Sequence, residues 1–372
     1  MRVSFLGNFR SPNIGNAALV KGAQRLIKED LNNLKWDFVP ISWDKITFGT
    51  AKFNQQDIEH ITSCDAFYVS GAVTFNNRAN HTLGGSRLNL SISQWEKIQI
   101  PIILGGLSYR HWGQSIYNNL EALKENLSYL NLRKDCLLGL RNDGTREWLQ
   151  KITGLQLESA YEVPDPGFFV LPPRDKNIDG YGLYISVNNE DYNERFTNVT
   201  QIQDLAKTLA KVCLQFFEIT QEDVFFVPHS FEDYAIFLKI FENLPPAFLH
   251  MYCKVLPMPA FDGALEVYEK YQTARLHIGM RVHSINPCLG MGVPTIALSS
   301  QDRISKFIRD IGMPSALVEL HSPFFPDSLL QKVEDFLRYK VITDKSDHYS
   351  VISATRARFR EFNKTVARLL QS

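Results

Sequence analysis

Short runs of apolar residues alternate with longer amphipathic segments along the whole chain. Small or polar residues follow each run, and the segments between the runs carry apolar residues at helical spacing, as in the helix predicted from Ala17 to Leu34. This alternation is typical of α/β proteins with parallel sheets. The predicted strands are Val3–Leu6, Ala66–Val69, Ile100–Leu104, Leu137–Leu140, Tyr181–Val187, Val224–Val227, Ala274–Ile278 and Thr295–Leu298.

The alternation breaks once, in Val163–Asp179, which is rich in proline, glycine and aspartate and has no helical period. We interpret this segment as a linker between two Rossmann-like domains, residues 1–172 and 180–345. In the last segment, residues 346–372, apolar residues again recur at helical spacing. The pattern predicts a C-terminal helix from about Ser350 to Leu370, which we expect to pack back on the first domain.

Length and charge narrow the class of protein. The 372 residues suit two domains. Because 40 basic residues balance 40 acidic ones, neither nucleic-acid binding nor a polybasic membrane anchor is favoured. The 5 cysteines are scattered and form no C-x-x-C pair, which favours free thiols in a reducing compartment. The N-terminus does not read as a signal peptide and no apolar run is long enough to span a bilayer, so we expect a cytoplasmic protein.

The densest group of reactive side chains is Arg281-Val282-His283-Ser284, at the predicted change from a strand to a helix. Ser284 is predicted to cap that helix. Backbone N–H groups and the dipole at a helix start favour an anion, and Arg281 adds a planar fork for phosphate or carboxylate. His283 can exchange a proton near neutral pH. The structural alternative is a histidine that only hydrogen-bonds to the backbone.

Several patches of the chain resemble the polysaccharide pyruvyl transferase family. Arg281-Val-His283, followed by Gly292-Val-Pro294 and Ser299–Arg303, is similar to the C-terminal signature of that family. The resemblance extends in order across nearly the whole chain. The other patches that carry it are Asn13–Asn16, Cys64–Gly71, Ile100–Ser108, Arg141–Thr145, Val163–Pro166 and Val227–Asp233.

Three positions depart from the family pattern. Asn16 stands where aspartate is usual, which removes a negative charge from the first loop. Ser70-Gly71-Ala72 replaces a loop of three glycines. Arg303 replaces lysine, which keeps the charge but changes its geometry.

The resemblance implies a GT-B-like architecture, in which two Rossmann-like domains face a cleft. It also implies an enzyme that moves the pyruvyl group of phosphoenolpyruvate onto sugar hydroxyls of a polysaccharide precursor, forms a ketal and releases phosphate during capsule or exopolysaccharide synthesis. This donor needs at least two cationic clamps and a general acid, and no cofactor. The acceptor sugar would be nucleotide-linked or lipid-linked, and a lipid-linked one would bring the protein to the inner face of a membrane.

The resemblance also implies roles for the donor side. His283 would protonate the methylene carbon of phosphoenolpyruvate. Arg281, with Val282 and Ser284 at the helix start, would hold its phosphate or carboxylate. Arg303 would contact the phosphate, unless it is a solvated loop arginine.

Arg141 is expected to be the second cationic clamp, supplied by the first domain. It ends a predicted strand, where the ligands of open α/β sheets bind. The alternative is an ion pair with Asp143 or Glu147.

The acceptor is expected near the turn made by Asn13, Gly15 and Asn16, which suits hydroxyls or a diphosphate. Simple capping of the first helix is the alternative. His229 and Asp233, after a second-domain strand, would bind acceptor hydroxyls or orient one another, with structural capping as the alternative. Three further residues complete the expected acceptor side: Ser108, Arg110 and His111.

Two other functions stay open at this stage. A GT-B glycosyltransferase that uses a nucleotide sugar would need a ribose-binding carboxylate in the second domain, for which Glu319 is conceivable. A catalytically inactive sugar-binding relative would explain Asn16 and the altered glycine loop. The sequence has no metal-binding histidine spacing, no G-x-G-x-x-G and no Walker sequence, so metal, NAD and ATP are not expected.

Overall fold

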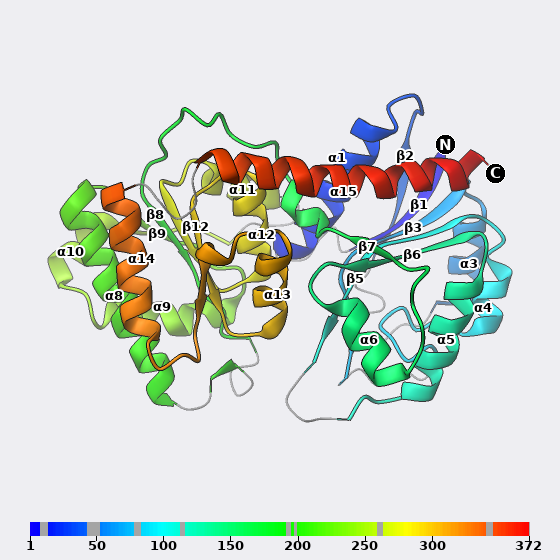
Figure 1. Cartoon of the computed structure of the whole chain (residues 1–372), viewed down its shortest axis with the longest axis horizontal. Coiled ribbons are helices and arrows are strands. Elements are labelled where there is room, and N and C mark those ends of the chain that lie inside the picture. The colour runs from blue at the N-terminus through cyan, green and yellow to red at the C-terminus, as the bar shows by residue number, and fades with distance from the viewer. Residues whose placement is uncertain are drawn as a thin grey trace. The chain divides into compact units, whose positions relative to one another are not determined.

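The computed structural model contains two compact units, each built on one parallel sheet (Figure 1). The first unit comprises Met1–Ser11, Leu19–Gly167 and Thr355–Ser372, and the second comprises Pro12–Ala18 and Phe168–Ala354. The structure describes residues 1–7, 14–42, 53–77, 83–111, 116–190, 195–196, 199–258, 263–339 and 345–371.

In the first unit the described residues form a sheet of seven parallel strands. The order is β2-β1-β3-β5-β6-β7, and β4 pairs with the end of β5. Chain order therefore reverses between β1 and β3, as in doubly wound folds. The strands are β1 (Arg2–Gly7), β2 (Asp37–Ser42), β3 (Ala66–Ser70), β4 (Val73–Asn76), β5 (Ile102–Arg110), β6 (Cys136–Arg141) and β7 (Tyr161–Val163).

Helices cover this sheet, so its central strands are apolar on both faces. Asn54 and Ser91 start their helices with capping boxes, in which side chain and backbone satisfy each other's orphan groups. The helices of this unit are α1 (Ile14–Asp30), α3 (Gln55–Thr62), α4 (Ile92–Lys97), α5 (Leu120–Leu132) and α6 (Thr145–Thr153).

The described strands of the second unit form a six-stranded parallel sheet in the order β10-β9-β8-β11-β12-β13. With β8 counted as the first strand, this is the 3-2-1-4-5-6 order of the Rossmann fold, and its switch point lies between β8 and β11. The strands are β8 (Leu183–Ser186), β9 (Val224–Phe226), β10 (Cys253–Val255), β11 (Leu276–Gly279), β12 (Thr295–Ser299) and β13 (Leu317–Glu319).

The first turn of α1 belongs to the core of the second unit. Ile14, Ala17 and Ala18 pack in one apolar cluster with residues such as Tyr268 and Met291. The helices of the second unit are α8 (Val199–Thr220), α9 (Tyr234–Phe241), α10 (Pro246–Tyr252), α11 (Ala264–Gln272), α12 (Val282–Gly290), α13 (Asp302–Asp310) and α14 (Phe325–Tyr339).

The C-terminal helix α15 (Lys345–Gln371) packs on the first unit from Thr355 onward, as the sequence predicts (red in Figure 1). Asp30 at the end of α1 accepts hydrogen bonds from Arg356 at 2.5 Å and from Asn363 at 2.8 Å. Burial alone would raise the pKa of Asp30, but the hydrogen bonds from Arg356 and Asn363 outweigh it and lower the pKa. A buried, charge-assisted cluster therefore fixes α15 to the end of α1.

The α/β pattern is confirmed, and each of the eight predicted strands overlaps one in the structure. The boundary between the two units falls inside Val163–Asp179, after Gly167, but the first half of this segment is not an exposed linker. Val163 ends β7, Pro166–Phe169 forms a 3-10 helix, and residues 163–170 are buried. Proline and glycine break the helical period here without bringing the chain to the surface.

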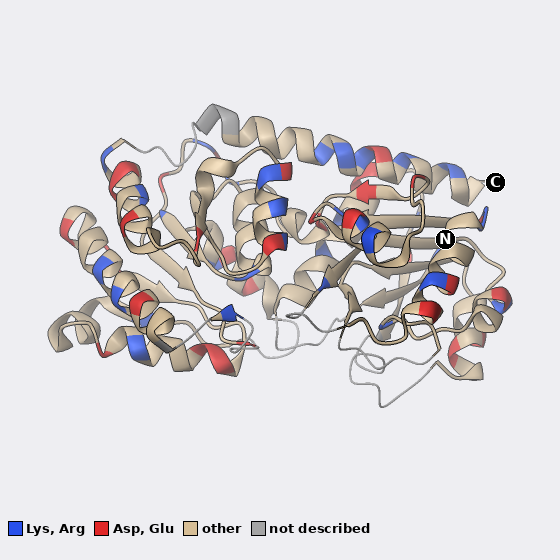
Figure 2. Ribbon diagram, turned by 60° about the horizontal axis from the view of Figure 1, so that its bottom comes forward, with Lys and Arg blue, Asp and Glu red and all other residues tan. Residues whose placement is uncertain are grey.

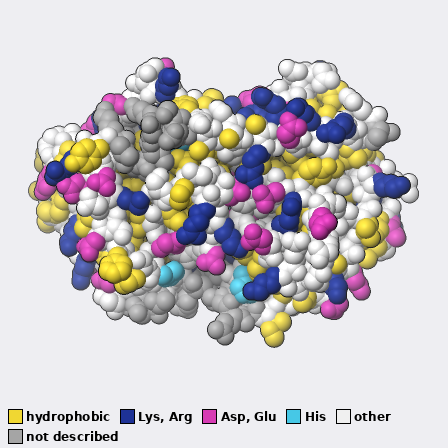
Figure 3. Space-filling model, in the orientation of Figure 1, with side chains coloured by type: hydrophobic (Ala, Val, Ile, Leu, Met, Phe, Trp, Pro, Cys, Tyr) yellow, Lys and Arg dark blue, Asp and Glu magenta, His cyan; other side chains and the backbone are white. Residues whose placement is uncertain are grey.

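Charges of both signs are interspersed over both units (Figure 2), and the face shown in Figure 3 carries basic and acidic side chains next to one another. This agrees with the balanced composition. Among the described residues, no helix has the length and apolar character that crossing a membrane requires.

Candidate active site

The site in the second unit is built where α12 begins. Arg281 follows β11 in an extended conformation and is the N-cap residue of α12. The prediction that Ser284 caps this helix is wrong, because Ser284 lies inside its first turn. Its hydroxyl donates to the carbonyl of Arg281 at 3.0 Å and accepts from Ser186 at 2.6 Å. Ser284 thus ties the first turn of α12 to the end of β8, at the switch point of the sheet.

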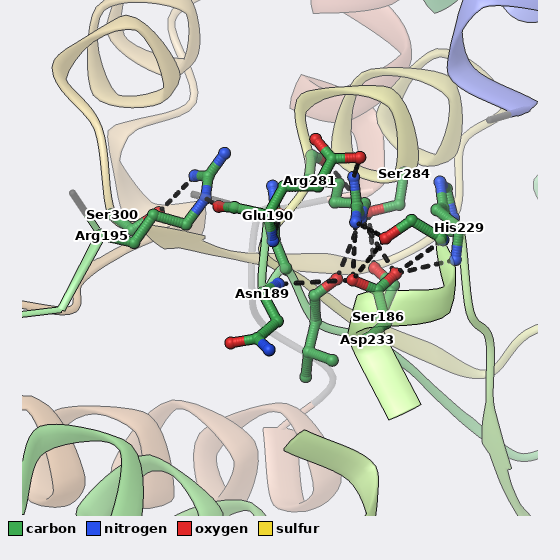
Figure 4. Close-up of polar contacts among 12 residues, drawn as sticks. Ser186, Asn189, Glu190, Arg195, His229, Asp233, Arg281, Ser284 and Ser300 are labelled. Atoms are coloured by element: carbon green, nitrogen blue, oxygen red, sulfur yellow. Dashed lines mark hydrogen bonds and ion pairs between the residues drawn. The ribbon is translucent and has the colours of Figure 1, made fainter. Parts of the chain in front are cut away.

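The guanidinium of Arg281 is held by two carboxylates (Figure 4). Its Nη2 donates to Asp233 Oδ1 at 2.6 Å and its Nε to Asp233 Oδ2 at 3.1 Å. Its Nη1 lies 3.1 Å from Glu190 Oε1, and the hydroxyl of Ser230 and the carbonyl of Val187 accept further hydrogen bonds.

The charges of Glu190 and Asp233 explain why the guanidinium of Arg281 is buried between them. Burial opposes the positive form of Arg281, but Glu190 and Asp233 outweigh burial, so that its pKa is raised. Asp233 also accepts from the backbone N–H groups of His229 at 2.9 Å and Ser230 at 3.1 Å. Asp233 thus contacts the backbone of His229, whereas the His229 ring lies against Tyr271 and the charge of Asp233 is paired with Arg281.

His283 lies in the first turn of α12 and is partly exposed. Its backbone carbonyl accepts from the hydroxyl of Tyr268 at 2.9 Å. Its ring packs against the first turn of α1: a Cβ atom added to Gly15 would overlap the imidazole. Glycine at position 15 is therefore what allows the ring to occupy this place, and the structure brings together a residue expected on the acceptor side and one expected on the donor side.

A buried polar network lies close to the helix start. His229 Nε2 is 2.8 Å from the hydroxyl of Tyr271, and Ser186 Oγ is 3.3 Å from His277 Nε2. Burial, assisted by the charge of Arg281, holds the pKa of His229 well below its usual range, and burial lowers the pKa of His277 to about 3. Both imidazoles are therefore neutral near pH 7.

His229 is only 1% exposed, and its Nδ1 makes no hydrogen bond to any residue that the structure describes. This burial opposes the expected contact between His229 and acceptor hydroxyls.

Sequence reasoning missed Glu190 and Arg195. Besides the pair between Glu190 and Arg281, Arg195 Nε donates to the backbone carbonyl of Glu190 at 2.6 Å and its Nη1 to Ser300 Oγ at 3.1 Å (Figure 4). Both residues follow the carboxyl end of β8. That position was the signal that could have marked them, but they form no motif with Arg281 in sequence.

The remaining donor-side residues have different surroundings. Val282 is buried in the first turn of α12. Arg303 lies half-buried in the first turn of α13, so the alternative of a solvated loop arginine is wrong.

Glu319, the conceivable ribose-binding carboxylate, accepts from Arg309 at 2.9 Å and from Ser305 at 3.1 Å, and these contacts involve both of its oxygens.

Arg141 ends β6 in the first unit, and its side chain has no exposed surface. Its Nη1 lies 3.0 Å from Asp165 Oδ2, so the expected alternative partners, Asp143 and Glu147, are not its ion-pair partners. None of its three side-chain nitrogens donates a hydrogen bond to a residue that the structure describes. Arg141 is therefore a buried, charge-paired cation with unused donors.

Asp143, at the same edge of the first sheet as Arg141, belongs to a separate hydrogen-bond network. It accepts from the hydroxyls of Ser108 and Thr145, both at 2.5 Å, and Thr145 Oγ1 accepts from the N–H of Tyr109 at 3.2 Å. Ser108 is thus buried in a structural network at the end of β5.

Arg110 and His111 follow on the same strand end, where Arg110 is half-buried and His111 is exposed. The ring of His111 lies 5.9 Å from that of Trp148. Asn16 lies inside the first turn of α1, and Asn13 lies outside the described residues. Within the described ranges, no group of three or more His, Cys, Asp or Glu side chains is placed to hold a metal ion.

Comparison with solved structures defines the class. A UDP-N-acetylglucosamine 2-epimerase from Listeria monocytogenes is similar at 12% identity, with 92% of this chain and 90% of that one covered and a TM-score of 0.51. The UDP-GlcNAc 2-epimerase of Methanocaldococcus jannaschii is similar at 13% identity, with 91% and 93% covered and a TM-score of 0.50. A UDP-forming trehalose-phosphate synthase from Burkholderia xenovorans is similar at 9% identity, with 100% and 98% covered and a TM-score of 0.51.

These likenesses concern the fold, and together with the two Rossmann-like sheets they place the chain in the GT-B-like class. A search of curated proteins finds no match. The family model for polysaccharide pyruvyl transferase matches residues 13–302, which include the start of α12 and the Arg141 edge. The chain belongs to the polysaccharide pyruvyl transferase family.

Proposed function

We propose that the chain transfers the pyruvyl group of phosphoenolpyruvate to two hydroxyls of a sugar in a polysaccharide precursor, forming a ketal and releasing phosphate. The observation that carries this proposal is the start of α12. His283, a partly exposed residue whose ring Nε2 is buried, lies there in the first turn of the helix, and Arg281 fixes the geometry of this turn through Asp233 and Glu190.

His283 is the proposed proton donor. The imidazolium gives its proton to the methylene carbon of the donor, and C2 becomes electrophilic. One sugar hydroxyl adds to C2 and returns its proton to the imidazole. The C2–O bond to phosphate then breaks, and the second hydroxyl closes the ketal and loses its proton to the departing phosphate. Family membership and the placement of His283 support this order of events.

The anionic groups of the donor need positive partners. The dipole at the N-terminus of α12 favours a phosphate or carboxylate there. In this proposal Arg281 is a positioning residue, because carboxylates already occupy its guanidinium. Arg141 is the proposed second cation, which its unused donors support. Because its side chain is buried beside Asp165, its role has to be tested in a variant that removes both charges.

The acceptor is proposed to be a nucleotide-linked or lipid-linked sugar for capsule or exopolysaccharide, bound in the cytoplasm and, if lipid-linked, at the inner face of a membrane. Gly15 and Asn16 are the acceptor-side residues that the geometry favours most, since Gly15 packs against the His283 ring.

The test is incubation with phosphoenolpyruvate and a panel of sugar acceptors, with phosphate release and the mass of pyruvylated product as readouts. We expect His283→Ala to lower phosphate release by about 10²- to 10⁴-fold, because a general acid typically contributes that much. The matched control is His250→Ala, which removes an exposed imidazole of the same unit. Its turnover should equal that of the unchanged protein.

Turnover by purified His283→Ala at the rate of the control would refute the role of His283. Thermal shift separates the remaining alternatives. Stabilisation by phosphoenolpyruvate supports the proposal, stabilisation by UDP-sugars alone indicates a glycosyltransferase, and stabilisation by sugars alone indicates an inactive relative.

A further inference from the structure

The second unit contains a cavity at the edge of its sheet opposite the Arg281 site. Arg275 and Pro294 line it and directly precede β11 and β12, and Gly180, which also lines it, lies shortly before β8, whereas Arg281 follows a strand. The cavity has a volume of about 90 Å³, room for several water molecules or a compact organic group. Since it lies at the amino ends of the strands, it is separate from the proposed catalytic site.

The cavity carries an excess of positive charge. Arg275 is neutralised by Glu222, whose two oxygens it contacts. Arg174 and Lys176 also line the cavity, with Asp179 as the acidic residue beside them. The Nη1 of Arg174 donates to the backbone carbonyls of Ala274 at 2.7 Å and Gln272 at 3.3 Å, and the negative charge of Asp179 acts on its guanidinium. Two cations therefore face one carboxylate.

The rest of the wall is largely apolar. Ile178, Pro294, Phe336 and Leu337 contribute to it. Burial lowers the pKa of Arg174, which means that the charge is poorly solvated and an anion there would be bound in a partly dry place. A cation set against apolar walls matches a ligand that has one anionic group and one apolar body.

The cavity is also built onto the carboxyl end of α12. Arg174 N–H donates to the carbonyl of Met291 at 2.9 Å, and His348 Nε2 lies 2.8 Å from the carbonyl of Leu289. The hydroxyl of Tyr349 donates to the carbonyl of Arg174 at 2.6 Å. Because α12 has 9 residues at about 1.5 Å each, its two ends are on the order of 12 Å apart. A ligand in this cavity would touch the groups that hold one end of the helix whose other end carries His283.

We propose that this cavity is a second binding site, for a small amphipathic anion whose carboxylate, sulfonate or phosphate meets Arg174 and Lys176 while its apolar part lies against Ile178, Phe336 and Leu337. The proposal does not depend on the pyruvyl transfer reaction.

The test uses two matched probes with the full-length protein, naphthalene-1-sulfonate and the neutral naphthalene-1-methanol, and measures their affinities by calorimetric titration. We expect the sulfonate to bind at least about tenfold more tightly, because only it gains charge-assisted hydrogen bonds. Arg174→Met should weaken sulfonate binding by about tenfold or more, and Lys176→Glu by several-fold at low salt. Lys207→Glu makes the same charge change at an exposed position of α8 and should leave the affinity unchanged.

Lys176→Glu keeps the test decisive if Arg174→Met proves unstable, since Lys176 is exposed and substitution there should not disturb folding. His283→Ala should bind the sulfonate normally, which separates this site from the catalytic one. The proposal is overturned if the sulfonate does not bind, if the alcohol binds equally well, or if Lys176→Glu and Lys207→Glu have the same effect.

Discussion

The two units each bury an arginine at the carboxyl edge of their sheet, and the two arginines differ in how they are satisfied. Arg281 donates to Asp233, Ser230 and Val187 and pairs with Glu190, whereas Arg141 has one ion pair, with Asp165, and no hydrogen bond to a described residue. A saturated guanidinium holds a structure in place, and an unsaturated one keeps donors for a ligand. The same residue type at equivalent strand ends is thus suited to two different tasks.

The largest expected effect is a loss of stability on replacing Arg281, the arginine whose side-chain nitrogens all have partners. Arg281→Met should lower the free energy of unfolding by about 3–5 kcal/mol, because it leaves Asp233 buried without its cation and facing Glu190. Urea unfolding measures this change. Adding Asp233→Leu should restore little, because the backbone N–H groups of His229 and Ser230 then lose the oxygen that accepts from them. A full recovery in the double variant would contradict the view of Asp233 as the anchor of the site.

The unsaturated arginine should behave differently. Arg141→Met should lower the free energy of unfolding by about 3 kcal/mol, since Asp165 is left buried without its cation. The double variant Arg141→Met/Asp165→Asn removes both charges and should recover most of that loss. If it folds and yet releases no phosphate from phosphoenolpyruvate, Arg141 acts on the donor. Turnover at the normal rate would instead make Arg141 a structural residue.

A third change tests how closely the His283 ring is placed. Gly15→Ala should lower turnover on the order of 10²-fold with little change in stability, because the new methyl group displaces the imidazole. The control is the same substitution in a His283→Ala background, where the methyl group has room and should have no further effect. Equal losses in both backgrounds would show that Gly15 acts independently of His283.

The smallest expected effect is on the pH dependence of stability, in which the two units again differ. The second unit buries His277, whose pKa is about 3 when folded, whereas the described histidines of the first unit, His60 and His111, are exposed. Between about pH 6.5 and 3 the unfolded chain binds the extra proton, so stability falls as the pH is lowered through this range and is unaffected by His277 above it.

For one such histidine the slope is about 1.4 kcal/mol per pH unit. His277→Gln should therefore flatten the dependence of the unfolding free energy between pH 6.5 and 5 by about that amount, as measured by urea unfolding. His250→Gln, at an exposed position, should leave the slope unchanged. An unchanged slope in His277→Gln would mean that the buried ring is protonated in the folded protein.

Local patterns in the sequence predicted much of the fold. Apolar runs and helical spacing predicted the α/β class, the principal strands and the C-terminal helix, because these depend on neighbours within a few residues. Order along the chain also allowed the family resemblance, which the match to residues 13–302 confirms. Edge strands such as β10 (Cys253–Val255) and β13 (Leu317–Glu319) escaped the pattern because they have few fully buried residues and so form no apolar run.

By itself, then, the sequence determined which residues stand at strand ends and helix starts, among them Arg141, Arg281 and His283. Only the tertiary structure decided their partners. Glu190 and Asp233 meet Arg281, Gly15 meets His283, and Asp165 meets Arg141 across 24 to 268 positions of sequence. The order of strands in a parallel sheet brings such distant residues together, and no local periodicity encodes that order.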